Sequence, residues 1–307
     1  MKRRQQGVAL VLVLWVVTLL AVIGGNFAFS MRGEAQIARN LLNAAQLQAQ
    51  ADAGQRLAWF ELLKPASEPQ RWQGDGMLHE FASASTVVRV SIVDESGKIN
   101  LNTAPDALLS GLFRSAGMTE EATASLLNAV LDWRTSGNIK LLGGAKEQEY
   151  LAAGKNYGPP NAPFETVDEL QRVLGMTSEI FRKIAPALTI YSRQPGLHPM
   201  FAPREALLAI PGINPAAVEQ FLVQRQQAAA NGQPAPVLAG SAGFLSVSSG
   251  GSAYTVRSEA TAPDGASFLR IAVVKPGTDQ KRPISVLTWG EGEARPMPAT
   301  GTIAPRN

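Results

Sequence analysis

The stretch GVALVLVLWVVTLLAVI, residues 7–23, decides the architecture of this 307-residue chain. It lies inside a longer segment without any charged residue, 5–31, and about 20 apolar residues suffice for a helix to cross a bilayer. Three basic residues, 2–4, precede the apolar stretch. By the positive-inside rule they hold the N-terminus in the cytoplasm. In a Gram-negative bacterium the sequence therefore predicts a single-pass inner-membrane protein with a periplasmic main body.

Three interpretations of the apolar stretch stay open. A cleavable secretory signal would need a small-residue A-x-A site behind it, and residues 24–30 offer none. A plain signal anchor fits the hydropathy. The third interpretation starts from Gly7, which stands between the basic leader and the apolar stretch and resembles the glycine of a type IV prepilin leader. This resemblance implies that prepilin peptidase removes residues 1–7 by cutting between Gly7 and Val8, and that Val8 is then N-methylated.

The helix is expected to continue beyond the membrane. Residues 32–64 are rich in Ala, Leu and Gln, which favour helix, and no proline occurs before Pro65. A continuous helix over 8–63 would be about 84 Å long. Residues 8–31 would form its transmembrane half and residues 32–64 its periplasmic half. The prolines at 65 and 69 are expected to end it.

The rest of the chain is expected to form β, helical and again β structure. Val88, Val90 and Ile92 alternate with other residues, as in a strand with one buried face. The predicted segments are a β segment at 70–100, an inserted helical domain at 101–227, and C-terminal strands with a tail at 237–307. The strands expected behind the helices are Phe244–Ser248, Tyr254–Thr261, Phe268–Lys275 and Ile284–Trp289. The β segment before the helical insert is expected to join these strands in one sheet.

The helical part contains an internal repeat. The sequence APDALL at 104–109 is echoed by APREALL at 202–208, and each copy runs into a glycine turn and a second helix. Between the copies, TVDE at 166–169 has the pattern of a capping box that opens a helix. A glycine turn follows that segment as well. The sequence therefore predicts three helix–hairpin–helix-like units.

The order of these features resembles the general secretion pathway protein K family, the large minor pseudopilins of type II secretion systems. The motifs that carry the resemblance are GVAL at 7–10 with LWV at 14–16, DESGKINLN at 94–102, Asp132-Trp133, Gly144-Ala145 with Tyr150, NAPF at 161–164, and DEL at 168–170. It implies an α+β fold in which a pilin-like long N-terminal helix packs on a small antiparallel sheet. A large all-helical domain, helix–hairpin–helix or SAM-like, is inserted into that sheet.

The resemblance also implies a function and partners. A member of the family is a non-enzymatic subunit at the tip of the pseudopilus, where it helps to initiate assembly and supports export of folded periplasmic proteins across the outer membrane. The implied partners are minor pseudopilins I and J, other pseudopilins, prepilin peptidase and the inner membrane. Pilin-like chains usually carry Glu at the fifth mature position, where this chain has Leu12. A subunit without that carboxylate suits the top of a filament.

Calcium is a further expectation that comes from the family. Its members carry an acid-rich segment of the type D-W-x-D-x-D…G-A-E-D, interpreted as a calcium site, and Ca²⁺ takes six to eight oxygen ligands. This chain has Thr135 and Gly137 where acids are expected, and Lys146 follows its Gly-Ala pair. The candidate ligands that remain are Asp132, Glu147 and Glu149.

Composition excludes many other functions. The chain has no cysteine and only two histidines, His79 and His198, so thiolate catalysis, Cys-ligated metals and multi-histidine centres are excluded. The adjacent acids Asp94 and Glu95 are interpreted as a solvated turn. The alternative function is a membrane-anchored helix–hairpin–helix protein that binds nucleic acid, as in DNA uptake. Residues 101–225 carry 11 basic and 12 acidic groups, and this balance disfavours contact with phosphates.

Overall fold

The computed structural model describes residues 6–292, apart from residues 66, 69, 84, 193, 232, 234–235, 239–242, 247–252, 278 and 280. Within the helices it leaves out the side chains of residues 6–8 and 230. The basic leader residues 2–4 and the predicted tail from 293 onward lie outside the described residues.

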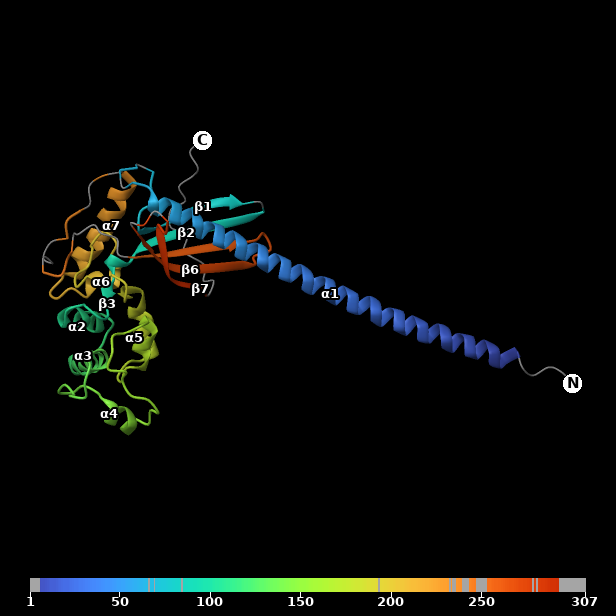
Figure 1. Cartoon of the computed structure of the whole chain (residues 1–307), viewed down its shortest axis with the longest axis horizontal. Coiled ribbons are helices and arrows are strands. Elements are labelled where there is room, and N and C mark those ends of the chain that lie inside the picture. The colour runs from blue at the N-terminus through green and yellow to red at the C-terminus, as the bar shows by residue number, and fades with distance from the viewer. Residues whose placement is uncertain are drawn as a thin grey trace.

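Helix α1, Gln6–Leu63, is 58 residues long and forms one uninterrupted element. It ends two residues before Pro65, as expected from the loss of an amide donor at proline. Figure 1 shows its N-terminal part projecting far from the globular body, while its C-terminal part lies across the sheet. The single long helix predicted from the apolar stretch is confirmed.

Five antiparallel strands form the main sheet in the order β1-β2-β5-β6-β7. Their bounds are β1 Asp75–Ser83, β2 Thr86–Asp94, β5 Tyr254–Thr261, β6 Ser267–Pro276 and β7 Ile284–Gly292. Strand β2 pairs directly with β5, from Val87 opposite Thr261 to Asp94 opposite Tyr254. The β segment before the helical insert therefore joins the strands after it, and this prediction is confirmed.

The strands differ from the prediction in two places. The β segment predicted at 70–100 contains a second strand, β1, which the sequence did not resolve because its residues are half-exposed without a regular alternation. It carries His79, whose ring stacks on Trp72 with centroids 3.9 Å apart. The strand expected at 244–248 does not form over its described residues 244–246. There, a single bridge joins Leu245 to Leu197, because this segment packs on the helical core.

Close contact with the sheet fixes the C-terminal part of α1. A Cβ on Gly54 would lie 2.2 Å from the Ser258 hydroxyl oxygen, so only glycine allows the helix to approach so closely. Next to it, the buried Gln55 side-chain amide donates to the carbonyls of Val256 at 2.9 Å and Arg270 at 3.0 Å. The buried face of β2 completes this core with Val88, Val90 and Ile92, each fully buried as predicted.

The inserted part is helical and has its own core. Its elements are β3 Ile99–Asn100, α2 Asp106–Ser115, α3 Glu120–Arg134, α4 Glu147–Ala152, the 3-10 helix Val167–Arg172, α5 Ser178–Ile184, the 3-10 turn Ala185–Ala187, β4 Leu188–Thr189, α6 Arg204–Leu208 and α7 Pro215–Asn231. Short strands β3 and β4 pair in parallel. Pro105 and Pro203 occupy the same N-cap position before α2 and α6, so the sequence repeat is a structural repeat. The core extends to Leu238.

Candidate functional site

The N-terminal two thirds of α1 have no partner within the described chain. Every residue from 9 to 46 is exposed, and Leu47 is the first buried one. By its length and composition, the helix is long and apolar enough to cross a membrane. Exposed leucine, valine, phenylalanine and isoleucine side chains on this scale mark a surface that lipid or other subunits cover.

Three predicted site residues lie at the start of this helix. The backbone of Gly7 and Val8 already belongs to α1, which begins at Gln6. Leu12 is 62% exposed. The first acidic residue along the helix is Glu34, so the apolar part offers no carboxylate to a neighbouring subunit.

Asp94 and Glu95 connect the sheet to the helical insert, and here the prediction of a solvated turn was wrong. Both residues are buried, at 4% and 2% exposure. The Glu95 carboxylate accepts hydrogen bonds from the Lys98 ammonium at 2.5 Å and the Thr255 hydroxyl at 2.6 Å. The Asp94 carboxylate accepts from the Ser96 amide at 2.8 Å. These acids hold β2, β5 and the entry to the insert together, which is a structural task.

The same junction is closed from the side of the insert by the segment before α6. The His198 amide donates to the Ser96 carbonyl at 2.9 Å, and a Cβ on Gly97 would lie 2.2 Å from the carbonyl carbon of Phe201. Burial raises the pKa of Asp94 above its ordinary value, partly offset by the hydrogen bonds from Ser96. Burial lowers the pKa of His198, which the nearby Asp94 opposes. The junction is therefore a packed polar interface.

The candidate calcium ligands are not brought together. The Asp132 carboxylate is 2% exposed and accepts from the Leu141 amide, with both oxygens at 3.2 Å. A Cβ on Gly144 would lie 2.1 Å from Asp132 Oδ2, which explains why glycine stands there. Within the described part of the chain, no group of three or more His, Cys, Asp or Glu side chains could hold a metal ion.

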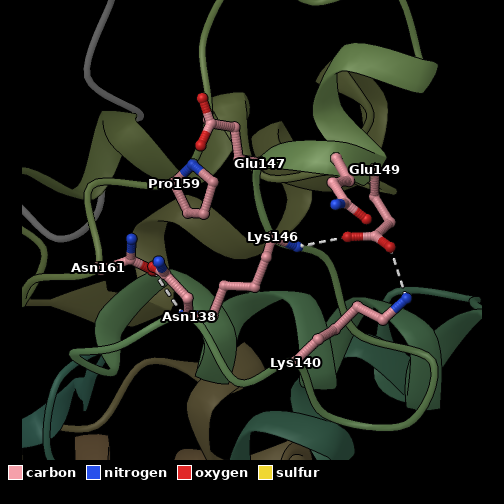
Figure 2. A pocket seen from close by; sticks show the side chains of 9 residues that line it. Asn138, Lys140, Lys146, Glu147, Glu149, Pro159 and Asn161 are labelled. Carbon is pink, nitrogen blue, oxygen red and sulfur yellow. Dashed lines mark hydrogen bonds and ion pairs between the residues drawn. The ribbon is translucent and has the colours of Figure 1, made fainter.

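The other two carboxylates face a shallow pocket of about 460 Å³ and have separate surroundings. Glu149 pairs with Lys140 at 2.5 Å and accepts from the Lys146 amide at 2.9 Å. The hydrogen bond from Lys140 is the main reason why the pKa of Glu149 is lowered. Figure 2 shows the Glu147 and Glu149 side chains pointing in different directions. The residues present therefore do not fit a calcium site of the family type.

Lys146 is the residue of this region that the sequence did not predict. Its side chain is buried, and its ammonium donates to the carbonyls of Asp132 at 2.6 Å and Thr135 at 3.2 Å and to Asn161 Oδ1 at 2.5 Å. The one signal in the sequence is a cation at a position where the family pattern has an acid.

Nearby, burial raises the pKa of Tyr150 to about 12, and its hydroxyl accepts from the Leu174 amide at 3.2 Å.

Comparison with known proteins supports one family. A family model described as "Type II secretion system (T2SS), protein K" matches residues 90–196. Type II secretion system protein K of Pseudomonas aeruginosa is 26% identical over 98% of this chain and 97% of its own length. The protein of the same name from Klebsiella pneumoniae is 25% identical over 68% of this chain and 71% of its own. The predicted resemblance to the protein K family is confirmed.

The fold comparison agrees with protein K. A chain of the GspK–GspI–GspJ complex from the enterotoxigenic Escherichia coli type 2 secretion system has a TM-score of 0.64 and 17% identity. The match covers 84% of this chain and 99% of that chain. At this identity the match shows a shared fold alone.

Proposed function

We propose that this chain is a non-enzymatic minor pseudopilin that assembles at the tip of the type II secretion pseudopilus and helps to initiate it. In that role it supports export of folded periplasmic proteins across the outer membrane. The observation that carries the proposal is helix α1, which packs on the sheet only from Leu47 onward and leaves residues 9–46 exposed. Neighbouring subunits and lipid would cover this length.

The proposed topology rests on the same helix. The apolar half, 8–31, would cross the inner membrane with its N-terminus in the cytoplasm, and the sheet and helical insert would lie in the periplasm. Prepilin peptidase would remove 1–7 and leave Val8 as the mature N-terminus. The proposed partners are minor pseudopilins I and J, because the similar fold occurs in the GspK–GspI–GspJ complex.

The helical insert serves as a packing scaffold of helix–hairpin–helix-like units in this proposal. Binding of nucleic acid by such units needs basic residues that are free to contact phosphates. The arginines beside the two outer hairpins are instead paired with acids, Arg114 with Glu120 at 3.4 Å and Arg204 with Glu219 at 2.6 Å. Together with the balanced charge of the insert, these pairs leave the nucleic-acid alternative without support.

The proposal is tested by co-purification from membranes. The full chain carrying an affinity tag at its C-terminus is expressed with minor pseudopilins I and J of the same organism, extracted in detergent and captured. We expect both partners to be retained in a fixed ratio through size-exclusion chromatography. Capture of the chain alone, under conditions where I and J still bind each other, would contradict the proposal.

A first prediction concerns Leu12→Glu. A carboxylate in an apolar helix is costly unless it is paired, and at this position it could pair with the N-terminal amine of a neighbouring subunit. We therefore expect the variant to fold and to be processed like the natural chain. Fluorescently labelled natural protein should appear only at pseudopilus ends, and labelled Leu12→Glu protein should also enter the shaft. Fluorescence microscopy of surface-exposed filaments measures both.

The matched control is Leu10→Glu, which places the same charge two positions earlier on the same exposed helix. It should not enter the shaft, because its carboxylate lies at another height from the neighbouring amine. Natural protein spread along the shaft at the level of the major pseudopilin would show that the tip assignment is wrong.

A further inference from the structure

We propose that the Lys146 ammonium is a built-in cation that closes the loop region where protein K relatives are expected to bind calcium, so that this chain holds the region without a metal ion. The proposal concerns the inserted domain alone and does not depend on the role of the chain in secretion.

The first argument is the hydrogen-bond inventory of Lys146. A lysine ammonium has three donors and no acceptor. Here three oxygens take them: the carbonyls of Asp132 and Thr135 and the side-chain oxygen of Asn161, at 2.5–3.2 Å. Lys146 is only 7% exposed, and a buried ammonium is tolerated only when such partners replace water. This is an oxygen cage around a cation, with the cation supplied by the chain.

The second argument is the origin of these oxygens. Asp132 and Thr135 lie at the C-terminal end of helix α3, Glu120–Arg134, where the last carbonyls have no partner within the helix and carry partial negative charge. A cation is stabilised there. The carbonyls at this end of α3 therefore favour a positive charge.

The third argument is the strained backbone of Asn161, the residue that supplies the third oxygen. Asn161 is the one non-glycine residue of the described chain with a positive φ, 54°. A residue that tolerates the left-handed region is still disfavoured there unless its contacts hold it. Its side-chain oxygen is the acceptor at 2.5 Å from Lys146 Nζ, and Figure 2 shows Asn161 and Lys146 meeting at the pocket wall. Lys146 thus ties the 158–162 loop to the end of α3.

The acidic side chains around this cage do not complete a metal site. The Glu149 carboxylate forms an ion pair with Lys140 and accepts a hydrogen bond from the Lys146 amide. The Asp132 carboxylate accepts a hydrogen bond from the Leu141 amide. A divalent ion at the position of Lys146 Nζ would find carbonyl and amide oxygens but no converging carboxylates. The chain therefore depends on the ammonium itself.

The test uses the full-length protein in detergent micelles, with thermal unfolding followed by near-UV circular dichroism. For the natural chain we expect the same Tm in EDTA and in millimolar Ca²⁺. Lys146→Met keeps the apolar stem and removes the charge and all three donors, so the Tm should fall by about 5 °C or more. The matched control is Lys140→Met, which removes a half-exposed ammonium from the same loop and should shift the Tm by about 1 °C or less.

A third variant tests the cage as a cation site. In Lys146→Glu the oxygens lose their cation and gain a carboxylate, so Ca²⁺ should raise the Tm of this variant and leave the natural chain unchanged. The proposal is overturned if EDTA lowers the Tm of the natural chain, if Lys146→Met unfolds at the same temperature as the natural chain, or if Lys146→Glu is indifferent to Ca²⁺.

Discussion

Replacing Gly97 by alanine should separate the helical insert from the sheet. Gly97 ends the 3-10 turn Glu95–Gly97 that follows β2, and it faces the backbone of the segment before α6. An added Cβ would lie 2.2 Å from the Phe201 carbonyl carbon, 2.3 Å from its oxygen and 2.5 Å from the Ala202 nitrogen. Backbone atoms cannot rotate away as a side chain can, so one of the two chain segments must move.

The expected loss is large for a single methyl group. Overpacking a tight contact costs about 1–3 kcal/mol, and a contact made only of backbone atoms belongs at the upper end, about 3 kcal/mol. The φ of Gly97 is not in the left-handed region, so alanine brings no conformational strain of its own. The effect would come from the contact alone.

The measurement is thermal unfolding of the full chain in micelles, together with limited proteolysis of the junction. A loss of about 3 kcal/mol corresponds to a Tm that is lower by roughly 5–10 °C for a chain of this size. Gly290→Ala in β7 is the control, because nothing lies within 4 Å of its added Cβ and it has the same effect on the unfolded chain. Equal Tm values for the two variants would refute a rigid junction.

Local periodicity explains what the sequence could predict. The apolar stretch and the absence of proline before Pro65 are sufficient for α1, and the alternation of Val88, Val90 and Ile92 is sufficient for β2. The repeat around Pro105 and Pro203 is also a local signal, because both residues precede a helix in the structure. Each of these features depends on neighbours within a few positions along the chain.

The features that the sequence did not predict depend on distant partners. Strand β1 lies at an edge of the sheet, and its half-exposed residues lack the alternation that marks a buried strand. Glu95 has the composition of a solvated turn, but the hydroxyl of Thr255, 160 positions later, takes part in burying it. The cage of Lys146 collects oxygens from α3 and from the 158–162 loop, and no spacing rule links these segments.

A substitution at Gly7 should abolish maturation. The proposed cleavage lies between Gly7 and Val8 at the start of α1, directly after the glycine that makes the leader resemble a type IV prepilin leader. In Gly7→Leu we expect a full-length precursor that keeps residues 1–7 and stays in the inner membrane. Without the free Val8 amine it would lack the positive charge at the position where a carboxylate from the subunit below is expected to pair, so assembly should be lost as well.

The intact mass of the purified full chain shows whether the leader has been removed and the new N-terminus methylated. The natural protein should lack residues 1–7 and carry one added methyl group, whereas Gly7→Leu should keep the leader and lack the methyl group. Gly24→Ala is the matched control, because an added Cβ at that position in the same helix meets nothing within 4 Å, and this variant should mature normally. A mature chain that begins beyond Gly24 would instead identify an ordinary secretory signal. The exposed residues 9–23 would then be absent from the working protein, and α1 could not carry the assembly role proposed for it.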